Sequence, residues 1–178
     1  RVATTANLSA SYSNGTAGVG ATLTASGNGA LSIDGVSPTT NDRILVKDQS
    51  TAAQNGIYKV TTQGSGSAAF VLTRATPEDQ PSELSGGAFT FVEEGTANAN
   101  NGYVFTHTGQ PTFGSTSLDV AQFSGAGQIT AGAALTKTAN QLDVAVDDSS
   151  IEVNADALRV KALGITNAML AGSIDGAK

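Results

Sequence analysis

Apolar and polar residues alternate in short runs over the first two-thirds of the chain. Val19, Ala21 and Leu23 occupy every second position, and Leu31 and Ile33 repeat the pattern. A period of two is typical of half-buried β-strands, because successive side chains point to opposite faces. Further strands are expected at residues 43–47, 57–62, 70–74, 88–92, 103–108 and 118–123.

Two of these segments carry a more specific prediction. Ile44, Leu45 and Val46 form a continuous apolar run between charged residues, as expected for a strand buried on both faces. The segments 57–62 and 70–74 are separated by a short polar loop, which indicates a β-hairpin.

The pattern predicts an all-β fold divided into two parts. No long segment with the 3.6-residue period of a helix interrupts the strands, so we expect residues 1–126 to form a small antiparallel β-sandwich or partly open barrel. Every Phe and Tyr precedes residue 124, and we expect the core there. The glycines at 125 and 127 place a boundary before a second part, residues 127–178.

The second part repeats an aliphatic, charged, valine, variable tetrad three times, starting at Leu142, Ile151 and Leu158. On a strand, the first and third side chains of each tetrad share one face, and the charged second side chain points the other way. The resulting apolar stripe consists of Leu142, Val144, Ile151, Val153, Leu158 and Val160.

One copy of this second part is too small to cover its own stripe. It has no aromatic residue and roughly fifty residues, fewer than a single chain ordinarily needs for a core. We therefore predict a homotrimer, an intertwined β-stalk in which these six residues form the oligomerisation surface. A short terminal helix is expected from Ile165 to Ala171, with Gly172 as its stop.

Charge and composition exclude several classes of partner. The formal net charge is -6, and nine Lys and Arg residues are scattered singly, so we expect neither nucleic acid nor an anionic membrane surface as partner. No apolar stretch reaches the roughly 18 residues of a membrane span. The chain has no Cys, which excludes disulfides and thiolate sites.

Candidate chemistry is sparse, and we predict a protein that is not an enzyme, with no catalytic, cofactor or metal site. The single His107 lies in an expected strand without a second His or Cys, and we interpret it as structural. The adjacent pairs Glu93–Glu94 and Asp147–Asp148 are interpreted as solvated loop charge. Calcium is the least implausible ion, because Asp147, Asp148 and Asn154 are nearby oxygen donors, but the EF-hand spacing is missing.

Short phrases of the sequence follow one another in a recognisable order. In the first part they are Val2–Leu8, Tyr12–Thr16, Gly18–Thr24, Ile33–Val36, Asn41–Gln49, Asn55–Tyr58 and Val71–Ala75, and in the second part Ile129–Gly132, Leu135–Thr138, Leu142–Val144 and Ile165–Ile174. The phrases of residues 2–124 resemble a module that recurs in bacteriophage tail fibre proteins. Those of the second part are similar to fibre-shaft sequences, although Ala133–Ala134 stands where a second Gly is expected.

The resemblance implies a trimeric, extracellular virion component that links the phage tail to a host-recognising tip. Other tail or baseplate proteins would be its partners. The main alternative is a receptor- or glycan-binding module, in which exposed Asn and Tyr side chains of the loop Asn98–Tyr103 contact a host surface sugar or protein. A third hypothesis, a polysaccharide hydrolase, is disfavoured by the short chain and its few acidic and aromatic residues.

Overall fold

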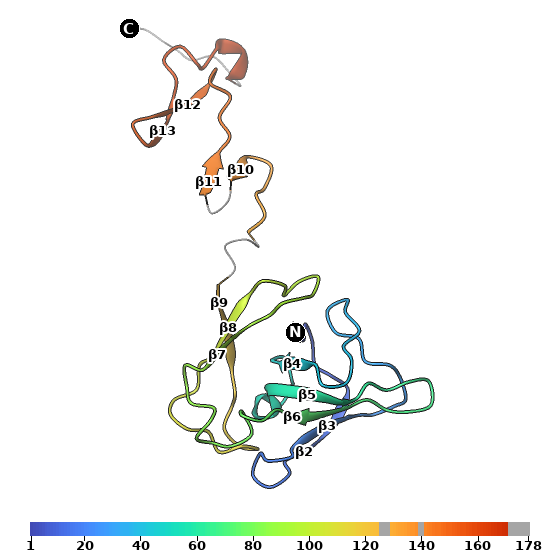
Figure 1. Ribbon diagram of the computed structural model, residues 1–178. Coiled ribbons are helices and arrows are strands. Elements are labelled where there is room, and N and C mark those ends of the chain that lie inside the picture. Colours follow the sequence, from blue (N-terminus) through green and yellow to red (C-terminus); the bar gives the residue numbers. More distant parts are fainter. Residues whose placement is uncertain (125–128, 139–140, 171–178) are drawn as a thin grey trace. The chain divides into compact units, whose positions relative to one another are not determined.

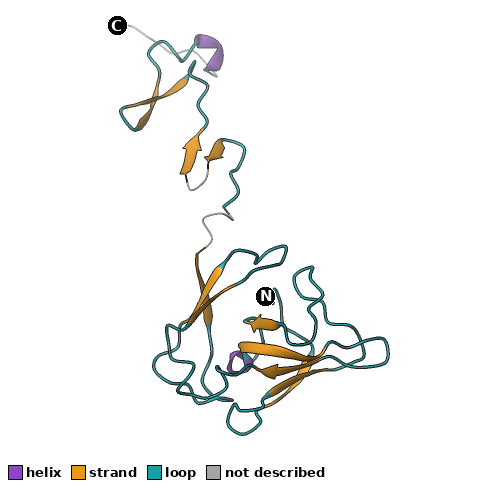
Figure 2. Cartoon of the chain, in the orientation of Figure 1, coloured by secondary structure: helices purple, strands orange, loops and turns teal. Residues whose placement is uncertain are grey.

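The computed structural model describes residues 1–124, 129–138 and 141–170, and it is nearly all-β, with several antiparallel sheets of which none is closed (Figures 1 and 2). The chain divides into a first unit, Arg1–Gly125, and a second unit, Ala126–Lys178. The boundary predicted at residues 125–127 lies outside the described residues.

A six-stranded sheet forms the main part of the first unit. Its order is β1-β4-β5-β6-β3-β2, and every neighbouring pair is antiparallel except β1 and β4, which are parallel. A 3₁₀ turn, η1 (Ala52–Gln54), precedes β5. The strands are β1 (Val2–Ala3), β2 (Ala10–Ser13), β3 (Thr22–Ala25), β4 (Arg43–Val46), β5 (Gly56–Thr62) and β6 (Val71–Arg74).

A three-stranded antiparallel sheet completes the first unit. It has the order β7-β8-β9, with β7 at Phe89–Phe91, β8 at Gly102–Phe105 and β9 at Val120–Ser124. Tyr103 and Phe105 of β8 are buried in a cluster that also contains Leu45 of β4 and Ile57 of β5. This core therefore joins the two sheets.

A second core lies on the other face of the six-stranded sheet. Ile44, Tyr58, Val60 and Leu72 are fully buried there. Adjacent loops supply Leu31 and Ile33 to the same cluster, so loop residues cover this face of the sheet.

The second unit contains two separate antiparallel hairpins. The first pairs β10 (Leu135–Thr138) with β11 (Gln141–Val144), and the second pairs β12 (Ile151–Asn154) with β13 (Ala157–Val160). A 3₁₀ turn, η3 (Asn167–Met169), follows. It lies inside the segment predicted as a short helix, and Ala171 and Gly172 lie outside the described residues.

Several strand predictions for the first unit are confirmed. Ile44, Leu45 and Val46 are all buried in β4, as a strand covered on both faces requires. The predicted hairpin is β5 with β6. The prediction of a strand at Leu31 and Ile33 is wrong, because Ile33 forms an isolated bridge with Val36 in a turn.

The large aromatic side chains are divided between core and surface. Tyr58, Phe105 and Phe113 are buried, as expected of core residues. Phe89 and Phe91 are exposed, although they occupy a predicted strand. Alternation identifies the two faces of a strand, but the packing of the sheet decides which face is inside.

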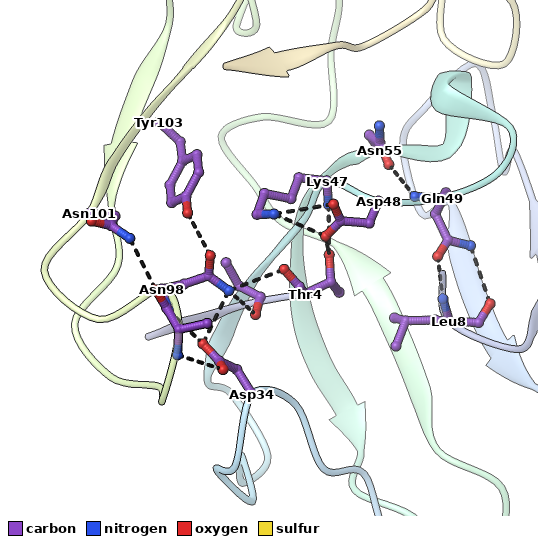
Figure 3. A network of polar contacts seen from close by, with 12 residues as sticks. Thr4, Leu8, Asp34, Lys47, Asp48, Gln49, Asn55, Asn98, Asn101 and Tyr103 are labelled. Atoms are coloured by element: carbon purple, nitrogen blue, oxygen red, sulfur yellow. Dashed lines mark hydrogen bonds and ion pairs between the residues drawn. The ribbon is translucent and has the colours of Figure 1, made fainter. Parts of the chain in front are cut away.

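A network of polar contacts fastens the loops of the first unit to its N-terminal strand (Figure 3). The Asn98 amide is its centre: Nδ2 donates to the carbonyl oxygens of Ala3 (3.3 Å) and Thr4 (3.2 Å), and Oδ1 accepts from the Tyr103 hydroxyl at 2.5 Å. Asn98 is buried, so every one of these bonds replaces water that the amide has lost.

Asp34 also holds this loop. Its carboxylate accepts the backbone N–H groups of Ala97 (2.9 Å) and Asn98 (2.8 Å) and the Asn98 Nδ2 (3.1 Å). Desolvation alone would raise the pKa of Asp34, but the hydrogen bonds from Ala97 and Asn98 together outweigh it, and the pKa is lowered.

Replacing Asp34 with Asn is expected to destabilise the first unit by about 1–3 kcal/mol at pH 7, because hydrogen bonds to a charged acceptor are lost. A lowered folded pKa gives stability that is present above the unfolded pKa, near 3.9, and is lost as the pH falls through the folded pKa. The difference between wild type and D34N, measured by chemical denaturation, should therefore shrink below about pH 4. Asp119→Asn, at an exposed position, serves as control, and we expect it to change the free energy of unfolding by no more than about 0.5 kcal/mol. Equal destabilisation by D34N and D119N would contradict the stabilising role of the Asp34 carboxylate.

Candidate functional site

Four of the six predicted oligomerisation residues lie on one face of the β12–β13 hairpin. Ile151 pairs with Val160, and Val153 pairs with Leu158. Directly opposed residues of an antiparallel pair lie on the same face, and so do residues two apart on a strand. The hairpin therefore gathers four aliphatic side chains into one continuous patch.

The other two predicted residues lie on the β10–β11 hairpin. Val144 pairs with Leu135, and Leu142 pairs with Lys137. Leu135 thus joins Leu142 and Val144 on one face, and the methylene stem of Lys137 extends it. The predicted oligomerisation surface did not include Leu135. The sequence held a signal for it, because Leu135 and Lys137 are two positions apart and therefore share one face of a strand.

Both faces are open to solvent. The exposed fractions are 37% for Ile151, 55% for Val153, 55% for Leu158 and 54% for Val160. Leu135, Leu142 and Val144 are 40–44% exposed. We refer to these seven side chains as the aliphatic faces.

The opposite face of the β12–β13 hairpin is charged. Glu152 pairs with Arg159 across the strands, and their side chains form an ion pair with 2.7 Å between Oε1 and Nη2. The Arg159 side chain is more than half exposed, so the pair contributes little stability by itself. Its main consequence is that one face of the hairpin is suited to water and the other is not.

A two-residue turn closes this hairpin. Ala155 and Asp156 both have positive φ, 45° and 63°, the arrangement of a type I′ turn. This turn makes the second and third tetrads the two strands of one hairpin, a pairing that the sequence analysis did not predict. Type I′ turns favour Asn-Gly, and Ala155 is a residue that the left-handed region disfavours.

The Asp147 carboxylate, a candidate calcium ligand, is engaged by its own loop. Oδ1 accepts the backbone N–H groups of Ser149 (3.0 Å), Ser150 (2.8 Å) and Ile151 (3.0 Å), and Oδ2 accepts the Ser150 hydroxyl. These bonds, led by that from the Ser150 side chain, lower the pKa of Asp147. The carboxylate thereby fixes the turn that leads into β12. Among the residues that the structure describes, no three His, Cys, Asp or Glu side chains are grouped to hold a metal ion.

The remaining candidates in the first unit are held in structural contacts. His107 Nε2 lies 3.1 Å from the Leu84 carbonyl oxygen, and its ring meets Phe105 edge to face. Glu94 forms an ion pair with Arg1 (3.0 Å). Of two depressions in this unit, one of about 450 Å³ holds a single carboxylate, Asp79, and one of about 170 Å³ holds two, Glu78 and Glu93.

The expectation that the loop Asn98–Tyr103 presents exposed Asn and Tyr side chains is wrong for every such residue but Asn100, which is exposed. Asn98, Asn101 and Tyr103 are all buried. Their polar groups serve the network of Figure 3, except the Asn101 Oδ1, which has no hydrogen-bond partner among the described residues. Lys47 Nζ lies 5.4 Å from the centre of the Tyr103 ring. Burial and internal hydrogen bonding leave these side chains no free surface for stacking on a sugar.

Comparison with protein-family models, curated proteins and solved structures gave no match to this chain. Within the described ranges of the chain, no helix is both long and apolar enough to span a membrane.

Replacing Ala155 with Asn is expected to stabilise the β12–β13 hairpin by about 0.5–1 kcal/mol, because Asn tolerates positive φ better than Ala. Amide hydrogen exchange in the full chain should show greater protection of the hairpin's cross-strand N–H groups. Ala157→Asn, two positions along in the strand, is the control, and protection that rises equally in both variants would contradict the turn assignment.

Proposed function

We propose that this chain is a structural segment of a bacteriophage tail fibre, and that three identical copies assemble through the second unit. The segment would link the phage tail to the part of the fibre that recognises the host. Its work would be mechanical, since it holds the tip at a fixed distance and transmits force, and we propose no catalytic activity and no cofactor for it. The assembled fibre would be extracellular, with other tail or baseplate proteins as its neighbours.

One observation carries the proposal. The aliphatic faces expose seven side chains in two hairpins, and each hairpin is too small to fold back and cover its own face. Monomeric proteins seldom leave a continuous apolar patch of this kind uncovered. Three copies arranged around an axis would place these faces inside and the Glu152–Arg159 face in water.

The sequence resemblance supports the choice of a tail fibre among homotrimeric proteins. It spans both units, and its phrases fall on scaffold elements. Arg43–Val46 is strand β4, whose Ile44, Leu45 and Val46 are buried. Asn55 supports a turn, since its Oδ1 accepts from Gln49 N and its Nδ2 donates to the Leu118 carbonyl oxygen. We further propose that the first unit is a β-sandwich, supported by the core shared between its two sheets, and that the second unit is a trimeric β-stalk.

Analytical ultracentrifugation of the full chain tests the proposal, with a trimer expected at micromolar concentration. Val153→Asp should weaken assembly by at least about 100-fold, because three buried carboxylates would meet without partners. The first unit should retain its fold, as judged by near-UV circular dichroism of its tyrosines.

Asn154→Asp is the matched control for this experiment. It adds the same charge on the same strand, but Asn154 pairs with Ala157 on the face that carries Glu152. We expect N154D to remain trimeric. A monomeric wild-type chain would refute the proposal, and a V153D chain that assembles normally would show that the oligomer is held elsewhere.

A further inference from the structure

Three phenylalanine rings form an exposed cluster on the second sheet of the first unit. Phe89, Phe91 and Phe123 are 66%, 56% and 53% exposed. Their ring centres lie 5.6–6.3 Å apart, and all three pairs meet edge to face. We call these three rings, with Val104 between them, the aromatic face.

The alternation of the strands explains why this face points outward. Phe89 pairs with Val104, which pairs in turn with Ala121, so these positions share one side of the sheet. Tyr103 and Phe105 lie on the other side and are buried in the core. The inner side is therefore already in use, and the aromatic face has no partner among the described residues of its own unit.

The middle of the aromatic face is apolar and suits a protein surface better than a sugar. Charged groups, among them Arg1 and Glu93, line a separate depression of about 170 Å³ at the edge formed by Phe89 and Phe91. A shallow depression of about 200 Å³ is lined by Phe89, Val104 and Phe123, whose side chains offer no hydrogen-bond donor or acceptor. Sugar recognition combines stacking with several polar contacts. The edge-to-face packing also leaves no flat, shared platform for a sugar ring.

We propose that the aromatic face packs against the same face of the other two copies around the three-fold axis. This inference rests on the trimeric assembly proposed above. Among the described residues of the first unit, the other exposed large apolar side chain is Val19, a single residue in a turn. A different surface of a neighbouring first unit would therefore offer no apolar complement beyond Val19, whereas its own aromatic face does.

Chain connectivity brings the three faces within reach of one another. Phe123 lies twelve positions before Leu135, where the aliphatic faces begin, and such a segment spans at most about 40 Å. Once the second units have assembled, each tethered aromatic face meets the other two at an effective concentration of roughly millimolar.

The area of the aromatic face determines the part that it plays. Three rings that are slightly more than half exposed offer roughly 300 Å² per copy. A stable interface needs about 800 Å² from each partner. The aromatic face is therefore too small to hold the oligomer alone, and it reinforces a trimer that the second unit forms.

The first test replaces the three rings in the full chain, as F89T/F91T/F123T. Threonine keeps a high strand propensity and removes the apolar surface. We expect the variant to remain trimeric at high concentration, with the midpoint concentration of assembly raised at least about tenfold in sedimentation equilibrium. Val19→Thr, which removes an isolated exposed apolar residue, should leave this midpoint unchanged.

The second test uses the absence of cysteine from the chain. Ala121→Cys places one thiol on the aromatic face, and Ser11→Cys places one at an exposed position of strand β2. Maleimide should label A121C at least about tenfold more slowly in the trimer than in the V153D background, while S11C should react equally in both. This readout remains decisive if the triple variant fails to fold.

The possible failures are distinguishable. A trimeric wild type whose midpoint is unchanged by F89T/F91T/F123T, and whose A121C thiol reacts equally in both backgrounds, would overturn this inference and leave the proposed function standing. A wild-type chain that is monomeric at every concentration would overturn both.

Discussion

The organisation of this protein depends on one constraint of antiparallel pairing: directly opposed residues share a face, and neighbours along the strand do not. In the first unit, Leu45 and Ile57 are opposed on neighbouring strands, and Tyr103 and Phe105 of the second sheet meet them in one core. In the second unit the same constraint gathers Ile151, Val153, Leu158 and Val160, but no second described sheet covers them. The same geometry produces a closed core in one unit and open aliphatic faces in the other.

Long loops in the first unit need a different kind of restraint. Buried polar side chains supply it, because an amide or carboxylate that has lost water must find fixed partners. Asn98 is bound to Ala3, Thr4, Asp34 and Tyr103, so one side chain joins the N-terminal strand, an early loop and the second sheet. The charge of Asp34 strengthens this junction, which explains why its pKa is lowered despite desolvation.

Sequence alternation predicted most of this arrangement, and its failures have physical causes. It identified β4 and the β5–β6 hairpin, and it placed the first and third residues of each tetrad on one face of a strand, because these features depend on local pattern. It missed the parallel pairing of β1 with β4, since contacts between residues 2 and 44 leave no local signal. It placed Phe89 and Phe91 in a strand without showing which face is buried, and it treated Asn98 and Tyr103 as exposed because loop polarity resembles surface polarity.

The type I′ turn at Ala155 and Asp156 also has a kinetic consequence. Ile151 and Val160 are nine positions apart, so the hairpin closes within microseconds, whereas the meeting of separate chains depends on their concentration. Each newly made chain would therefore form this marginally stable hairpin, and expose its aliphatic face, before its partners arrive. High expression would shorten this interval, and dilution would prolong the exposure of surfaces that aggregate.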